Sequence, residues 1–307
     1  MLRDKAHLKE LVLEWTERGE GSYSEEDISN TEKVFEQLIP PHSLEDLCIS
    51  RFFGRQYPTW FGTTCLYSLI HLRLRNVRSC VELPPIWQLP NLKYLRIDGA
   101  HAVSKVGPEF VGCKKGDPVC NEIVAFPKLE WLIIRDMRNW EEWSFFEEVE
   151  EFAVDEGRED GAVETRPEDA QSARLSLLPR LVLLRLENCP KLRTLPRQLG
   201  EDTTNLKMLK LIGANNLKAV EDFPHLADLL LIEKCEGMER ISNLPQVTKL
   251  HVHGCPNLSH VEGLGSLQQL WLGEDMQEVS SRWVPGLQEH HQRLHGEALD
   301  VYTLSTS

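Results

Sequence analysis

A six-residue pattern of aliphatic residues, Leu-x-x-Leu-x-Leu, recurs along this chain. Ten copies share one phase, and they begin at Leu8, Leu44, Leu69, Leu92, Leu129, Leu181, Leu206, Leu226, Val247 and Leu267. Successive copies start 36, 25, 23, 37, 52, 25, 20, 21 and 20 residues apart. One copy is a weak signal, because any amphipathic strand can supply it. Ten copies in phase restrict the chain to a repeat architecture.

Each copy predicts a short strand, because its alternate side chains point toward one side and the intervening ones toward the other. A single unit cannot bury its leucines, so neighbouring units must stack in parallel. Six of the nine intervals match the 20 to 29 residues of a leucine-rich repeat. We therefore predict an α/β fold: a leucine-rich-repeat solenoid, or horseshoe, with a concave parallel sheet of short strands and a convex face of loops and short helices.

The repeats predict a solenoid of about ten units over residues 1–273 and a C-terminal capping segment over 274–307. The first long interval has an apolar stripe that ends at Pro40-Pro41, which predicts a convex helix. Helical spacing of Leu287, His291, Leu294 and Ala298 predicts a terminal helix that covers the end of the stack. The chain starts only seven residues before Leu8, so we expect the first repeat to need an upstream neighbour.

One copy is ambiguous by a residue. The run LLLIEKC allows either Leu229 and Leu231 or Leu230 and Ile232 to be the inward pair.

The formal net charge is −14, and most of it lies in one insertion. Between Glu141 and Asp169 there are 13 acidic residues and two arginines, a net of −11, which leaves −3 for the rest. A nucleic-acid partner held by phosphate contacts is therefore not expected. The later part of the insertion, residues 148–174, has too few apolar residues to offset the entropy of ordering, so we expect it to be mobile.

No stretch of about 18 apolar residues and no secretory signal is present, so we expect a cytoplasmic protein without a membrane partner. The sequence also lacks phosphate-binding loops and the motifs of hydrolases and metalloproteases. We therefore predict no enzyme activity, no catalytic residue and no cofactor in this chain. His251, His253 and Cys255 have short spacing, but the first two flank an inward valine, which argues against a metal site.

The residues between the inward leucines should line the concave face. These positions are rich in arginine, tyrosine and tryptophan, the types that most often anchor protein interfaces. We predict a protein-binding surface formed by Arg73, Arg75, Tyr94, Arg96, Trp131, Arg135, Arg185, Lys210, His251 and Trp271. Six cations between Leu69 and Leu211 face only two anions, Asp98 and Glu187.

Three interpretations of this basic stripe remain open. It can be the ordinary solvated charge of a solenoid sheet, a docking face for an acidic protein surface, or a contact for the chain's own acidic insertion.

Several segments resemble plant nucleotide-binding leucine-rich-repeat disease-resistance proteins, especially the coiled-coil class of cereals. They are HLKELVLEW, FEQLIPPHSLEDLCISRFFGRQYPTWF, LPPIWQLPNLKYLRIDGAHAVSKVGPEFVG, AFPKLEWLIIRDMRNWEEWSF, LENCPKLRTLP and LQEHHQRLHGEALDVYTL. The resemblance implies the recognition and autoinhibitory repeat region of an intracellular immune receptor. Its implied partners are a pathogen effector, or a host protein that an effector modifies, and a nucleotide-binding switch domain in cis or in trans.

This chain has no motif of the nucleotide switch, so ADP or ATP would bind only to an upstream nucleotide-binding domain, if one exists. The alternative hypothesis is a freestanding leucine-rich-repeat adaptor or decoy without such a switch.

Overall fold

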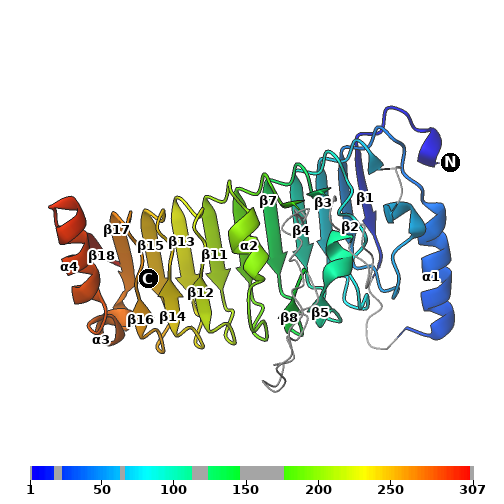
Figure 1. The fold of residues 1–307 in the computed structure, drawn as a ribbon. Coiled ribbons are helices and arrows are strands. Elements are labelled where there is room, and N and C mark those ends of the chain that lie inside the picture. The colour runs from blue at the N-terminus through cyan, green and yellow to red at the C-terminus, as the bar shows by residue number, and fades with distance from the viewer. Residues whose placement is uncertain (1, 17–22, 63–65, 113–123, 146–175, 305–307) are drawn as a thin grey trace, which may run out of the picture.

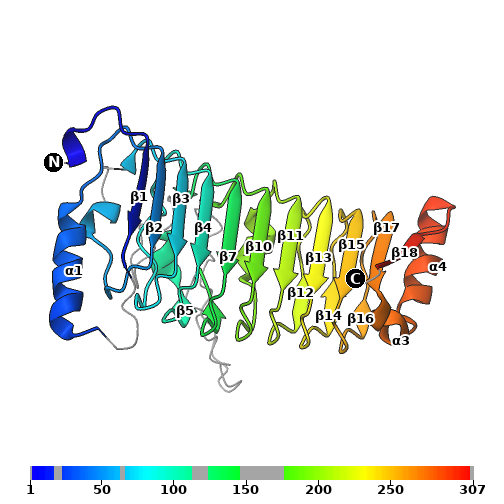
Figure 2. The same cartoon turned by 180° about the vertical axis from the view of Figure 1, so that it is seen from behind.

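The computed structural model describes residues 2–16, 23–62, 66–112, 124–145 and 176–304. In these ranges, eleven strands form one parallel sheet in sequence order and lie side by side along the stack (Figures 1 and 2). The predicted leucine-rich-repeat solenoid is thereby confirmed. The strands are β1 (Glu10–Glu14), β2 (Asp46–Ser50), β3 (His71–Arg75), β4 (Tyr94–Asp98), β7 (Trp131–Arg135), β10 (Leu183–Glu187), β11 (Met208–Ile212), β13 (Leu229–Glu233), β15 (Lys249–His253), β17 (Gln269–Gly273) and β18 (Asp300–Leu304).

The inward leucines of neighbouring strands meet in register. Leu184 of β10 pairs with Leu209 of β11, and Leu186 pairs with Leu211. All four side chains are fully buried. Because each repeat contributes the same inward pair, the core is one continuous column along the stack.

The eighth repeat settles the ambiguity in its sequence. In β13 the buried residues are Leu230 and Ile232, whereas Leu229 and Leu231 stay on the open side of the sheet. Leu226 is also buried, so this repeat has one more residue than the others between its first leucine and its inward pair. The added residue lies before the strand, and the register of β13 with β11 and β15 is unbroken.

A left-handed backbone conformation follows eight of the strands. These residues have positive φ: Arg51, Asn76, Gly99, Asp136, Asn188, Gly213, Lys234 and Gly254. Seven of their amides extend the sheet by one step, as where Asn188 N donates to Ile212 O at 2.8 Å, whereas Gly254 N donates to Asp275 Oδ2 at 2.7 Å. At Gly99 an added Cβ would lie 2.9 Å from Asn76 Oδ1, so glycine relieves both the strain and the contact. The chain therefore leaves the sheet in the same direction after each strand.

Three cysteines lie in the turns that follow β10, β13 and β15, each two residues after the end of its strand. Cys189, Cys235 and Cys255 are buried and free, and the thiols of Cys235 and Cys255 donate to backbone carbonyls two residues earlier, each at 3.4 Å. Burial raises the pKa of Cys189 and of Cys255 to about 12 and that of Cys235 to about 11. These thiols are therefore neutral at physiological pH.

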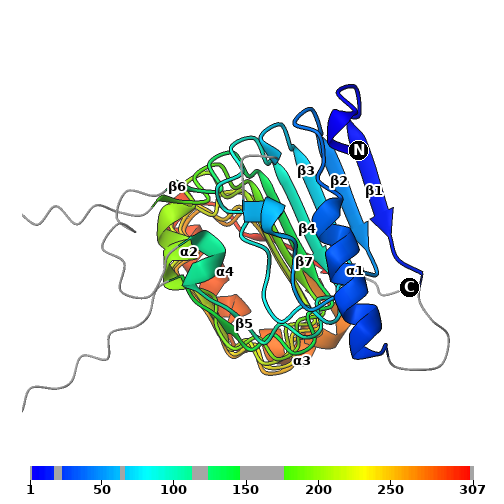
Figure 3. The same ribbon diagram turned by 90° about the vertical axis from the view of Figure 1, so that its right-hand side faces the viewer.

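The connecting segments form a wall opposite the sheet, as the view along the stack shows (Figure 3). This wall contains α2 (Arg197–Asp202) and three small parallel sheets. The small sheets are formed by β12 (Ala219–Glu221) with β14 (Arg240–Ser242) and β16 (His260–Val261), by β5 (Lys105–Val106) with β8 (Glu142–Trp143), and by β6 (Val124–Ala125) with β9 (Ser176–Leu177). Short 3-10 turns span Leu2–Asp4, Thr59–Gly62, Pro108–Val111 and Glu274–Met276.

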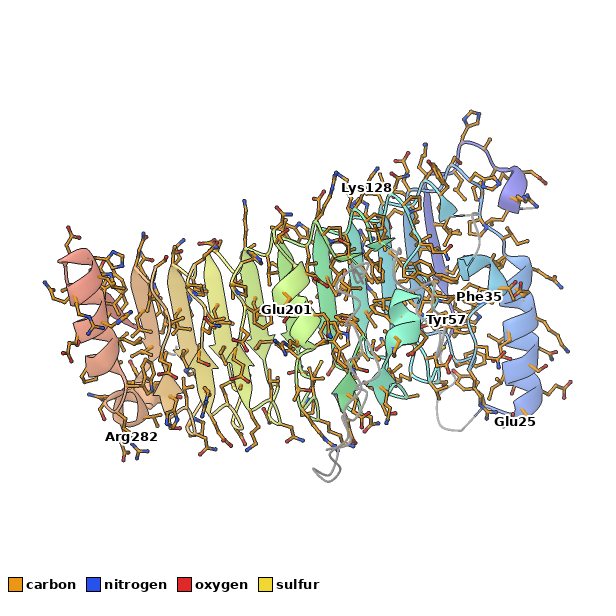
Figure 4. All side chains as sticks on the ribbon, viewed as in Figure 1. Glu25, Phe35, Tyr57, Lys128, Glu201 and Arg282 are labelled. Carbon is orange, nitrogen blue, oxygen red and sulfur yellow. The ribbon has the colours of Figure 1, made fainter. Side chains whose placement is uncertain are left out.

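The helix expected between the first two repeats is α1 (Glu25–Gln37), and it lies beyond β1 at the N-terminal end of the stack, where the sequence predicted a convex position (Figures 1 and 2). It begins at a capping box in which Ser24 and Asp27 each accept from the other's backbone amide, and it ends before the two prolines. Phe35 anchors the helix, because its ring lies 5.0 Å from Trp15 and 4.7 Å from Phe52 (Figure 4).

The start of the acidic insertion packs on the solenoid. Trp140, Trp143 and Phe145 are buried, with the two indole rings 5.1 Å apart. The expectation of mobility over residues 148–174 lies outside the described residues.

The C-terminal segment forms α3 (Gln277–Ser280) and α4 (Val284–His295), so the expected helix is present at the end of the stack (Figure 1). Leu287 is its buried contact, whereas Leu294 is 54% exposed. The chain then adds β18 in parallel beside β17, a strand that the sequence pattern did not predict. At the other end, β1 exposes 66% of Val12 and only half-buries Leu11 and Leu13.

Replacing Leu209 by Ala removes a fully buried side chain and leaves a cavity between two repeats. We expect the free energy of unfolding to fall by about 2–5 kcal/mol in urea denaturation. The control is Leu294→Ala on the exposed side of α4, which should change it by less than about 0.5 kcal/mol. Equal losses in the two variants would contradict the stacked core.

Because their pKa values are raised in the fold, the buried thiols of Cys189, Cys235 and Cys255 stay protonated while an unfolded thiol ionises near pH 8.5. The unfolded state then binds fewer protons, so stability should fall as the pH rises from about 9 toward 12. Urea denaturation between pH 8 and 11 measures this fall. The triple Cys→Ala variant should show a shallower one, and an unchanged slope would show that these thiols do not contribute.

Candidate functional site

The open face of the sheet carries the side chains that alternate with the inward leucines, and it is the predicted concave face. Each five-residue strand offers three such positions, and parallel register aligns them into a first, a middle and a last row. All ten residues predicted to bind lie on this face. His71, Tyr94 and Trp131 lie side by side in the first row, and Arg73 and Arg96 in the middle row.

Three arginines of the middle row have carboxylate partners within the sheet. Arg73 forms two hydrogen bonds to Asp46 of the preceding strand, at 2.9 and 3.0 Å. Arg96 donates to Asp98 of its own strand at 2.7 Å, and this bond raises the pKa of the guanidinium. Bidentate geometry and partial burial make such pairs stronger than exposed ones.

Glu187 serves two arginines at once. Its carboxylate oxygens lie 2.7 Å from Arg135 of the neighbouring strand and 2.7 Å from Arg185 of its own strand. Only 14% of the Glu187 side chain is exposed. Over β2 to β11 the open face therefore has six cations and three anions, because Asp46 adds to the two anions counted from the sequence.

Two of the predicted cations differ from the others. In the part of the chain that the structure describes, Arg75 and Lys210 have no ion pair. Arg75 is exposed at the end of β3, and Lys210 is half-buried in the middle of β11. Their charge is therefore the part of the basic stripe that remains for a partner.

Apolar side chains form a line that runs across the strands in the first row as far as β13 and then changes to the middle row. In the first row it contains His71, Tyr94, Trp131, Leu183, Met208 and Leu229. Trp131 is 44% exposed, and the guanidinium of Arg73 lies 5.9 Å from the Tyr94 ring centre. From β13 onward the line continues in the middle row.

The middle row ends in an aromatic row, which we define as His251, Trp271 and Tyr302. These residues occupy equivalent positions on β15, β17 and β18. The Trp271 ring lies 5.6 Å from that of His251 and stacks on that of Tyr302 at 4.3 Å. Burial lowers the pKa of His251, and the charges of Lys249 and Lys210 lower it further.

The histidine and cysteine cluster considered from the sequence is split by the sheet. His251 and His253 lie on the open side, whereas Cys255 is buried beyond the strand. His253 Nδ1 lies 2.6 Å from Asp275 Oδ1. Across the described ranges, no group of three or more His, Cys, Asp or Glu side chains is arranged to hold a metal ion.

Sequence reasoning missed several members of this face, among them Asp46, Leu231 and Tyr302. Asp46 follows the second repeat's first leucine by two residues, and the same alternation that selected Arg73 would have selected it. Leu231 depended on the ambiguous register of β13. Tyr302 had no leucine pattern to reveal it, because β18 has the sequence Asp-Val-Tyr-Thr-Leu.

Comparison with known proteins identifies the kind of solenoid. Residues 1–100 match the family described as R13L1/DRL21 LRRs. The chain is 24% identical over 288 residues, 87% of its length, to disease resistance RPP13-like protein 1 of Arabidopsis thaliana. It is 28% identical over 218 residues, 71% of its length, to disease resistance protein RGA2 of Solanum bulbocastanum.

The chain is similar to plant disease-resistance proteins. The resemblance seen in its sequence motifs is thus confirmed. The matched stretch covers 26% of the RPP13-like protein 1 and 21% of RGA2, so the chain spans about a quarter of these relatives or less.

Among solved structures, the leucine-rich repeat domain of the type III effector XopL superposes with a TM-score of 0.44 at 18% identity. The superposition covers 85% of this chain and 66% of that one. Within the described residues, none of the helices has the length and apolar character needed to cross a bilayer.

Proposed function

We infer that this chain is the recognition and autoinhibitory leucine-rich-repeat region of a plant immune receptor, and that it acts by protein–protein binding in the cytoplasm. Its partner on the open face would be a pathogen effector or a host protein that an effector has modified. A second contact, in cis or in trans, would restrain a nucleotide-binding switch domain. The similarity to disease-resistance proteins supports this proposal.

The observation that carries the binding role is the open face itself. Arginine, tryptophan and tyrosine bury large areas with few rotatable bonds and hydrogen-bond at their tips, so they dominate the energetics of interfaces. Here such residues stand in aligned rows on a rigid sheet. A partner would therefore meet a preorganised surface and would not have to order it on binding.

The proposal requires no chemistry within the chain. We expect it to bind no cofactor, and ADP or ATP would belong to an upstream nucleotide-binding domain. The open face offers charge and apolar area, which are the means of binding a protein surface.

Substitution of Arg75 and Lys210 tests directly whether the basic part of the face contributes to partner binding. Reversing Arg73, Arg96 and Arg185 would place new carboxylates beside Asp46, Asp98 and Glu187 and would also disturb the fold. The double variant Arg75→Glu/Lys210→Glu breaks no ion pair of the described ranges, and only position 75 is in register with a carboxylate, that of Asp98.

The experiment is a two-hybrid screen of the full chain against a panel of pathogen effectors and host defence proteins. We expect at least one effector or host protein to bind the wild type and to lose at least tenfold in affinity with Arg75→Glu/Lys210→Glu, measured by calorimetry. The matched control is Arg197→Glu/Arg282→Glu, which makes the same charge change on α2 and beside α3 (Figure 4 labels Arg282) and should bind normally. Partners that bind the two double variants equally well would contradict recognition by the open face.

A further inference from the structure

We propose that the C-terminal part of the open face, from Lys210 to Tyr302, is a docking site for an extended protein segment with an acidic residue followed by apolar residues at alternate positions. This inference rests on the proposed function, because it assigns the kind of partner that the open face takes. Its argument depends on β18, which places Tyr302 beside Trp271.

The apolar part of the site is one side chain wide at its centre, on β15 and β17. Leu231, His251, Trp271 and Tyr302 follow one another in the middle row on β13, β15, β17 and β18. At the centre Lys249 and Gln269 lie in the first row and His253 and Gly273 in the last row, whereas Leu229 and Leu304 widen the two ends. A helix presents a broad apolar stripe about two residues wide, whereas an extended segment presents a single file. The width of the line therefore favours an extended segment.

The positive charge of Lys210, at one end of the line, determines where the bound segment would carry its acidic residue. Lys210 precedes Leu231 in the middle row and has no ion pair in the described part of the chain. Lys249 lies beside the same line and pairs with Asp228 at 3.2 Å, where both side chains are more than 40% exposed. A carboxylate of the bound segment would meet the uncompensated charge of Lys210.

The distance between Lys210 and Trp271 matches the side-chain repeat of an extended segment. Neighbouring strands lie about 4.8 Å apart, so Lys210 and Trp271 are separated by three spacings, about 14 Å. Side chains on one face of an extended segment repeat every ~6.7 Å. A carboxylate at position i over Lys210 therefore places position i+2 over Leu231 and His251 and position i+4 over Trp271. Tyr302, 37% exposed, covers the next residue.

The exposed ring area at the far end would anchor the segment. Trp271 and Tyr302 stack face to face, with ring centres 4.3 Å apart and planes 17° apart, and together form one aromatic pair. The indole Nε1 of Trp271 has no hydrogen-bond partner in the described residues, which leaves a donor unsatisfied. An extended segment has free backbone carbonyls, and a small shift of the ring would let the indole donate to one of them.

The test is selection of a random 12-residue phage-display library on the immobilised full chain. We expect enrichment of peptides that carry Asp or Glu at position i and apolar residues at i+2 and i+4. A synthetic peptide of the enriched sequence should lose about 30-fold in affinity with Trp271→Ser, as expected for an aromatic anchor, and at least tenfold with Lys210→Glu. The matched control is Tyr67→Ser, which removes a ring that is 59% exposed and lies before β3, outside the open face, and should leave affinity unchanged.

Tyr302→Ser provides a second variant, because it truncates an exposed ring on the last strand and is less disruptive than loss of Trp271. Circular dichroism melting establishes that each variant is folded. No enrichment on the wild type, enrichment of basic sequences or of a helical i, i+3, i+4 pattern, or equal binding to Trp271→Ser and Tyr67→Ser would each overturn the proposal.

The protein partner identified by the two-hybrid screen separates this proposal from the proposed function. If that partner is sensitive to Arg75→Glu/Lys210→Glu but insensitive to Trp271→Ser and Tyr302→Ser, the open face recognises proteins and the C-terminal docking site is wrong. If all four substitutions leave its binding unchanged, the proposed function itself fails.

Discussion

No repeat of this chain can bury its own leucines, and the rest of the structure depends on this. Each strand leaves its inward pair half covered until the next strand is added, so stability resides in the contact between neighbours. The fully buried pairs of β10 and β11 show the result in the middle of the stack, and the half-buried Leu11 and Leu13 of β1 show what an edge looks like. The same constraint keeps the strands parallel and in register, and register then determines the surface.

Register turns an irregular sequence into an ordered surface. The left-handed residue after eight of the strands directs the chain off the sheet at the same place, so open positions align across repeats that differ in length. Side chains 52 residues apart in sequence, such as Arg135 and Glu187, become partners. As a result, much of the basic stripe is compensated within the sheet, and the aromatic and aliphatic side chains carry more of the free surface than the count of charges suggests.

The sequence predicts the part of the structure that repeats. Leucine spacing determines the strands, and alternation determines which residues are open, so the ten predicted residues all lie on one face. The sequence does not predict how the arginines are shared, because Asp46, Asp98 and Glu187 reach them through register and rotamer choice. It also misses β18. This strand is the last of the sheet, so Val301, which is in register with the inward Leu270, stays 40% exposed. A position that is not fully buried does not require leucine, and the leucine pattern therefore does not extend to this strand. The open position of Leu231 could not be chosen from LLLIEKC, since two phases of alternation were equally apolar.

The pairing of β7 with β10 has a consequence for how such a protein can change over generations. Trp131 to Arg135 and Leu183 to Glu187 are adjacent at every position, although the chain between them is far longer than an ordinary repeat connection. Closing a loop costs free energy that grows only with the logarithm of its length, about 0.6 kcal/mol for each doubling. Insertions and deletions at this junction are therefore inexpensive, and they leave the rows of the open face where they were. The junction is a site where the length of the chain can vary while the open face is inherited unchanged.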